Sequence, residues 1–218
     1  MPNKRVGIFA GLGLTVAAVA ATVGVAPSGA LEPAANEMEK LKACEQKLCE
    51  MVVKKAESGD DLKCDIGKTW AKAKIVEGGK GGKWSWAFDD ARCGVEVSAK
   101  RATVVSAVTK PEHALEFTEH TIKCDLESGK DVTQVTIKMA PKITFKEGKA
   151  DKAWLNVKLI EAPAHIKALI WTAAQLEDNL GIFHGTMISE INEFLHQKCP
   201  KAMGVPAAAA PKKEKKQK

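Results

Sequence analysis

The sequence contains none of the short motifs that mark the common catalytic and metal-binding sites. It has no H-E-x-x-H zinc motif, no G-x-S-x-G nucleophile elbow and no C-x-x-C pair. Residues 67–69, Gly-Lys-Thr, resemble the end of a phosphate-binding loop, but Leu62 occupies the position of that loop's first glycine. These absences predict that the protein is not an enzyme and carries no metal and no cofactor. An enzyme whose site is assembled in space, and is not visible in the sequence, stays as an alternative.

The titratable side chains do not form a recognisable site either. The five histidines are His113, His120, His165, His184 and His196. Glu112 and Glu119 each precede a histidine, but neighbouring side chains in a strand point to opposite faces. Asp89-Asp90 can bind a cation or act as an acid–base pair, although a solvated bend is the commoner role of such a pair. We therefore assign no catalytic, cofactor-binding or metal-ligating residue.

The chain also lacks a basic body, in spite of its formal net charge of +6. Lys4 and Arg5 lie within the first thirty residues, and residues 211–218 hold five lysines against Glu214. Without these two segments, the charges of residues 31–210 cancel. A neutral body excludes a nucleic-acid partner, because such binding depends on clustered lysine and arginine. The Lys-rich tail can still make weak contact with an anionic envelope surface.

The first thirty residues have the three-part order of a secretory signal peptide. Lys4 and Arg5 precede an uncharged apolar run over residues 6–26, and Ser28 and Ala30 place small side chains at the −3 and −1 positions of a cleavage site. We expect cleavage after Ala30, which leaves no transmembrane segment in the mature chain. This pattern predicts export, with the periplasm as the favoured compartment. Secretion, or anchoring by an uncleaved signal, are the alternatives.

Six cysteines follow the predicted cleavage site, and an even number in an oxidising compartment predicts three disulfides. The candidate disulfide cysteines are Cys44, Cys49, Cys64, Cys93, Cys124 and Cys199. In a helix, Cys44 and Cys49 would have Cα atoms about 8.6 Å apart, beyond the limit of about 7 Å for a disulfide. These two residues are therefore predicted not to join. The full set that we predict is 44–199, 49–64 and 93–124.

Hydrophobic periodicity predicts an α+β fold. Helical spacing of apolar residues covers the segments 37–57, 166–180 and 187–195. Alternating spacing predicts strands over 62–66 with an extension through 70–76, and over 84–88, 93–97, 103–108, 115–126, 135–139, 143–145 and 154–160. Because the strands form an unbroken run between helices, we expect a curved antiparallel meander of about five to seven strands, preceded by an N-terminal helix. Two C-terminal helices would pack on this sheet.

The chain is expected to contain one folded domain between two segments of different character. Residues 1–30 are the predicted signal peptide, and residues 31–203 are the predicted α+β domain. Residues 204–218 are rich in proline, alanine and lysine and have no apolar stripe to bury. We predict a disordered tail for them.

Aromatic side chains on the predicted strands supply a candidate apolar ligand surface, because a curved sheet can line a pocket. The candidate residues are Trp84, Trp86, Phe88, Phe117 and Trp154. The alternative is that these side chains only fill the core. We predict an exported, non-catalytic binding module for a small apolar ligand or an envelope protein partner. A cell-envelope structural or assembly protein that uses its cationic tail is the second hypothesis.

Overall fold

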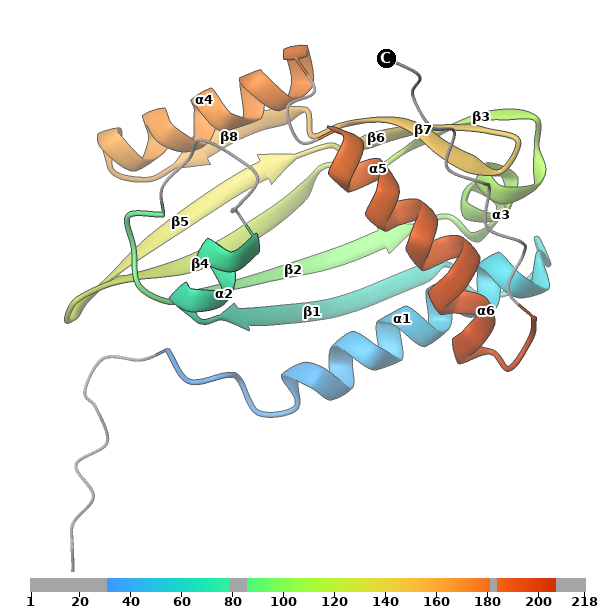
Figure 1. The fold of residues 1–218 in the computed structure, drawn as a ribbon, viewed down its shortest axis with the longest axis horizontal. Coiled ribbons are helices and arrows are strands. Elements are labelled where there is room, and N and C mark those ends of the chain that lie inside the picture. The colour runs from blue at the N-terminus through green and yellow to red at the C-terminus, as the bar shows by residue number, and fades with distance from the viewer. Residues whose placement is uncertain (1–30, 79–85, 181–183, 207–218) are drawn as a thin grey trace, which may run out of the picture.

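The fold is described from a computed structural model that covers residues 31–78, 86–180 and 184–206 of the 218-residue chain. Over these residues the protein has an N-terminal helix, two antiparallel sheets and C-terminal helices that pack on them (Figure 1). The predicted α+β class is therefore confirmed. The predicted signal peptide, most of the predicted tail and Trp84 lie outside the described residues.

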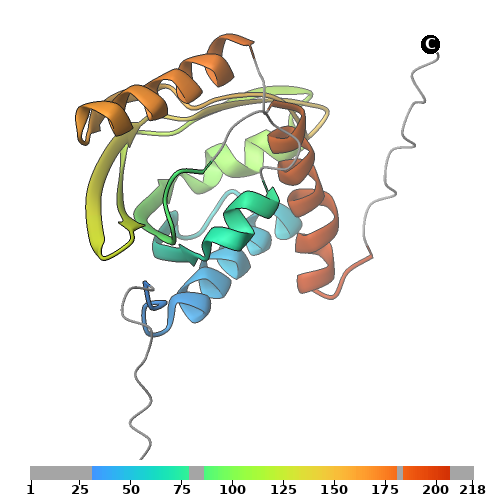
Figure 2. The ribbon, with the colours of Figure 1, turned by 60° about the vertical axis from the view of Figure 1, so that its left-hand side comes forward.

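The larger sheet has five strands in the order β1-β2-β4-β5-β8, and every neighbouring pair is antiparallel. The strands are β1 (Leu62–Trp70), β2 (Ala91–Ala99), β4 (His120–Ser128), β5 (Asp131–Met139) and β8 (Val157–Glu161). The register places Ile66, Val95, Ile122, Ile137 and Ile160 directly opposite one another in a row across the sheet. Because side chains alternate along a strand, this row marks a single apolar face. The sheet is curved (Figure 2).

A smaller sheet of three strands has the order β3-β6-β7. Its strands are β3 (Glu112–Glu116), β6 (Lys142–Lys146) and β7 (Lys149–Trp154). The predicted strand over 115–126 is thus two strands, β3 and β4, in two different sheets. The chain leaves the larger sheet after β5 and returns at β8, where Ala140 and Asn156 exchange two hydrogen bonds: Ala140 N–H donates to the Asn156 carbonyl, and Asn156 Nδ2 donates to the Ala140 carbonyl.

Helices cover both edges of the larger sheet (Figure 1). The helices of the described residues are α1 (Glu37–Lys54), α2 (Lys72–Gly78), α3 (Arg101–Thr109), α4 (Ala164–Leu180), α5 (His184–Glu193), the π-helical turn η1 (Phe194–Lys198) and α6 (Cys199–Ala202). Helix α1 lies along the edge strand β1, where the buried Glu37 carboxylate accepts hydrogen bonds from the Thr69 N–H and hydroxyl. The Glu37 carboxylate thus satisfies one backbone donor of this edge strand, whose unpaired groups could otherwise recruit another chain.

Two predicted strands are wrong, because these residues are helical. Residues 101–109 form α3, and β1 ends at Trp70 before α2 begins. In each case a distant carboxylate satisfies a backbone donor of the first turn: Asp61 accepts from Arg101 N–H at 2.9 Å, and Asp90 accepts from Lys72 N–H at 2.9 Å. An acidic side chain at a helix start also interacts favourably with the helix dipole. Of the predicted strand 84–88, the described residues Trp86–Phe88 lie outside any strand.

The six cysteines form three disulfides, Cys44–Cys64, Cys49–Cys199 and Cys93–Cys124. The pair 93–124 is confirmed, as is the prediction that Cys44 does not join Cys49. The predicted pairs 44–199 and 49–64 are wrong: Cys44 joins Cys64, and Cys49 joins Cys199.

The direction of α1 explains this exchange. The helix runs along β1 with Glu37 beside Thr69 and Cys44 beside Cys64. Cys49 therefore lies about 7.5 Å further along the helix axis, towards the end of the helix. At this point α6 contacts α1 and brings Cys199 into bonding distance, with a Cα–Cα separation of 4.7 Å.

Candidate functional site

Buried apolar side chains among the described residues gather in two clusters. The first cluster joins α1, α3 and η1 to the smaller sheet and to one end of β1 and β2. The second cluster joins Phe88, strands β2, β4 and β5, and α4. The candidate site lies within the first cluster, where the side chains leave a cavity.

The cavity has a volume of about 420 Å³ and lies between helices and strands that are far apart in the sequence. Leu62, Val97 and Ala99 line it from the apolar face of β1 and β2. Leu48 and Val52 line it from α1, one turn of helix apart. The alternation of β1 and β2 and the 3.6-residue period of α1 thus direct apolar side chains towards the same space.

A further wall comes from α3, which contributes Val104, Ala107 and Val108 to the cavity. Val104 and Ala107 are almost fully buried, with exposed fractions of 4% and 1%. Residues three and four apart lie on one face of a helix, so these side chains form a continuous apolar stripe. The same valines produced the incorrect prediction of a strand over 103–108, because β-branched residues are enriched in strands.

The smaller sheet and the C-terminal helices complete the cavity. Phe117 and Phe145 contribute aromatic surface next to β3 and within β6. Ile191, Phe194 and Leu195 face the cavity from α5 and η1. The π-helical turn therefore forms part of the lining, and the disulfide at Cys199 immediately follows it.

The charged residues at the cavity lie on one rim. Among the described residues that line it, the charged ones are Glu190 and Lys198, whose side chains are 64% and 54% exposed. The Lys198 ammonium lies 3.8 Å from a Glu190 carboxylate oxygen and 3.3 Å from one of Glu193. The site thus combines an apolar interior with a polar, solvated edge, a composition typical of pockets that hold small molecules.

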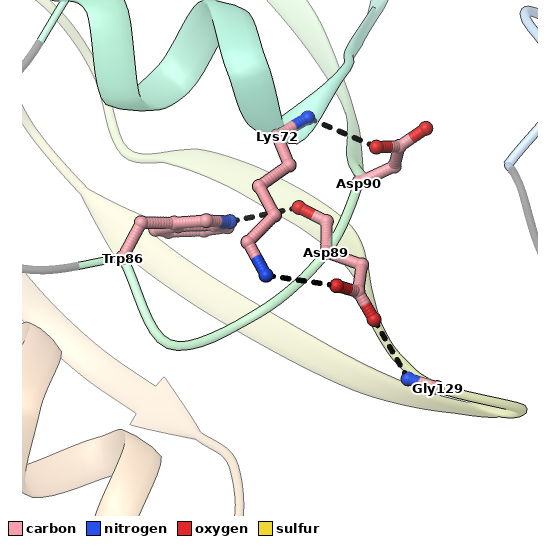
Figure 3. A network of polar contacts seen from close by, with 5 residues as sticks. All are labelled: Lys72, Trp86, Asp89, Asp90 and Gly129. Atoms are coloured by element: carbon pink, nitrogen blue, oxygen red, sulfur yellow. Dashed lines mark hydrogen bonds and ion pairs between the residues drawn. The ribbon is translucent and has the colours of Figure 1, made fainter.

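Asp89 and Asp90 have structural roles in a separate network (Figure 3). The Asp89 carboxylate accepts a hydrogen bond from Gly129 N–H at 2.8 Å and pairs with the Lys72 ammonium at 3.0 Å. The Gly129 N–H and the Lys72 ammonium hold the pKa of Asp89 below its ordinary value. Trp86 Nε1 donates to the Asp89 carbonyl at 2.8 Å. Because Asp90 accepts from the backbone of α2, both carboxylates tie chain segments together.

The aromatic residues predicted to form a ligand surface do not gather in one place. Phe117 lines the cavity. Trp86 and Phe88 belong to the second cluster, where their rings meet edge to face with centroids 5.3 Å apart. Trp154 is half-buried at the end of β7, and Trp84 lies outside the described residues. The sequence analysis missed the aliphatic lining of the cavity. The clearest sequence signal for that lining was the helical stripe that includes Leu48 and Val52.

Two histidines, His120 and His196, have defined hydrogen-bonded surroundings. His120 is buried; its Nε2 accepts from Ser98 N–H at 3.0 Å, so Nδ1 carries the proton and donates to the Thr118 carbonyl at 2.6 Å. Burial lowers the pKa of His196 below its ordinary value, although a backbone hydrogen bond with Gly148 opposes this effect. No group of three or more metal-ligating side chains occurs in the part of the chain that the structure describes.

In comparison with known proteins, no protein-family model, curated protein or solved structure matches the chain. A proposal about function therefore rests on the geometry of the site. None of the helices in the described ranges is both long and apolar enough to cross a membrane. The three disulfides indicate an oxidising, exported location.

Proposed function

We propose that this protein is an exported, non-catalytic binding protein that holds a small apolar ligand in the cavity between α1, α3 and η1. The observation that carries the proposal is an apolar space of about 420 Å³ with charge only at its rim among the described lining residues. Pockets for drug-sized ligands measure about 300–1,000 Å³. An apolar cavity of about 150 Å³ already binds benzene, so this space is large enough for a more extended molecule.

The disulfides support a cavity that is formed before the ligand arrives. Cys44–Cys64 joins α1 to β1, and Cys49–Cys199 joins α1 to the end of η1, so three of the lining elements are covalently connected. A preformed site improves affinity because less conformational entropy is lost when the ligand binds. The disulfides and the predicted signal peptide also favour the periplasm as the place of action, since such bonds persist in that compartment.

Titration with N-phenyl-1-naphthylamine tests the proposal. This neutral dye becomes fluorescent in apolar surroundings, and we expect saturable binding with one site per chain. The substitution Ile191→Trp places a bulky ring in the cavity and should weaken dye binding about tenfold. This is the effect of losing about two buried methylene groups from the contact with the dye. Ser189→Trp adds the same ring at an exposed position of α5 and should leave the affinity unchanged.

The proposal is wrong if the native chain does not bind the dye, or if both tryptophan variants bind it equally strongly. Thermal unfolding of each variant establishes that the comparison is made between folded chains.

A further inference from the structure

We propose that the ligand is an amphiphile with a hydrocarbon body inside the cavity and a cationic head group at the rim beside Glu190 and Glu193. This inference rests on the proposed function and names the chemical class of the ligand. It follows from two features of the site: the chemistry of its interior and the balance of charge at its edge.

The interior selects a body without polar atoms. Helices α1 and α3 and strands β1, β2 and β6 present aliphatic and phenylalanine side chains to the cavity. A ligand hydroxyl or amide placed among them would lose its hydrogen bonds to water and gain none from these side chains. Burying such a group without a partner is strongly unfavourable. Each methylene group that enters the same space strengthens binding about fourfold, so a hydrocarbon chain is favoured.

The rim selects the sign of the head group. Two carboxylates, of Glu190 and Glu193, lie within 4 Å of one ammonium, that of Lys198. Lys198 is therefore already paired on both sides, and the three side chains together carry one net negative charge. A cationic head at this edge gains from the excess carboxylate, whereas an anionic head has to compete with two carboxylates for the same ammonium.

The expected discrimination is modest, because all three side chains are substantially exposed. The exposed fractions are 64% for Glu190, 43% for Glu193 and 54% for Lys198. Ion pairs at such positions contribute about 0.2–1 kcal/mol, which corresponds to at most about fivefold in affinity. The effect should shrink in salt, since charges at the surface are screened over about 8 Å at physiological ionic strength.

Displacement of the bound dye by three ligands that share one tail and differ in the head group tests this inference. Decyltrimethylammonium, decanol and undecanoate share a ten-carbon tail and are compared at pH 8, in low salt and below the concentrations at which they form micelles. We expect the affinity to fall in this order, with about fivefold between the cation and the carboxylate. Combined substitution of Glu190→Gln and Glu193→Gln should remove or reverse the preference, whereas Lys198→Gln should widen it.

The outcomes separate this inference from the proposed function. If the dye binds but undecanoate binds as tightly as the cation, or if none of the three displaces the dye, the assignment of the ligand as a cationic amphiphile is wrong and the apolar site survives. If the preference persists in the double glutamine variant, the assignment of the head group to this rim is wrong. If the dye itself does not bind, the proposed function fails, and the inference fails with it.

Discussion

The two apolar clusters are held together in different ways. In the first, aliphatic and phenylalanine side chains from distant elements line a half-open cavity, and two disulfides connect α1 to β1 and to the end of η1. In the second, Trp86 and Phe88 pack edge to face, and Asp89 ties their segment to Gly129 in the turn after β4. The first region is tied by two disulfides around the cavity, whereas the second combines one disulfide, Cys93–Cys124, with ring packing and hydrogen bonds. Covalent ties allow a wall to be stable without the contacts that would fill the cavity.

Removal of disulfides should have the largest effect and should differ between the regions. The bond Cys49–Cys199 closes a loop with a sequence separation of 150, whereas Cys93–Cys124 in the second region closes one of 31. Loop-closure entropy predicts losses of about 5 and about 4 kcal/mol when each pair is replaced by alanine. Urea unfolding of the two double variants measures both losses. A larger loss for the 93–124 pair would contradict the importance of the covalent tie in the first region.

Truncation of one leucine in each region should have the next largest effect. Leu126 of the second cluster and Leu195 of the cavity wall are 6% and 8% exposed, so they form a matched pair. We expect Leu126→Ala to cost about 4 kcal/mol, because it opens a new void among packed side chains. Leu195→Ala should cost about 2 kcal/mol, since this side chain already borders empty space. Equal costs in chemical denaturation would argue that the two regions are packed alike.

Enlargement of one valine in each region should change stability differently. The first region should be unchanged or stabilised, and the second should be destabilised. Val104 lines the cavity, and Val135 lies in the second cluster; they are 4% and 2% exposed. Val104→Phe should range from neutral to about 1 kcal/mol of stabilisation, because the ring enters available space. Val135→Phe should destabilise by about 2 kcal/mol through overpacking. Melting temperatures of the two variants give the comparison, and a destabilised Val104→Phe would be evidence against the cavity.

The smallest expected effect is a pH dependence that originates near the first region. Burial lowers the pKa of His196 below 6.5 in the folded chain, so the unfolded chain binds this proton first as the pH falls. The stability associated with neutral His196 is therefore complete above about pH 6.5 and is lost as the pH falls from there through the lower folded pKa. Unfolding at pH 7.5 and 5.5 should show a smaller difference for His196→Gln than for the native chain. The same substitution at the exposed His165 is the control; an identical response of both variants would contradict the assignment.

The parts of the fold that the sequence predicts depend on local periodicity. The stripe of α1 and the alternation in β1, β2, β4 and β5 place their apolar residues correctly, because burial follows the period of each element. The missed elements depend on distant partners. Helix α3 begins where Asp61 accepts from Arg101, forty residues away, and β3 pairs with β6 across the whole of β4 and β5.

The candidate site was less predictable than the fold for the same reason. Aromatic residues suggested a ligand surface, yet of the four predicted residues that the structure describes, Phe117 is the one that lines the cavity. The cavity exists because Val52, Val104 and Phe194 meet, and these residues come from three helical segments spread over the chain. The disulfide Cys49–Cys199 brings two of these segments together, and its pairing could not be chosen from spacing alone.

A crystal structure under xenon pressure tests the central claim most directly. Xenon enters dry apolar cavities without the need for a head group or a particular shape, and its anomalous signal identifies its position. We predict a xenon site in the native protein in contact with Val104, Phe145 and Phe194, and the loss of that site in Val104→Phe. Xenon that is absent from this cavity, or unaffected by the added ring, would contradict the claim that the first region contains an apolar binding site.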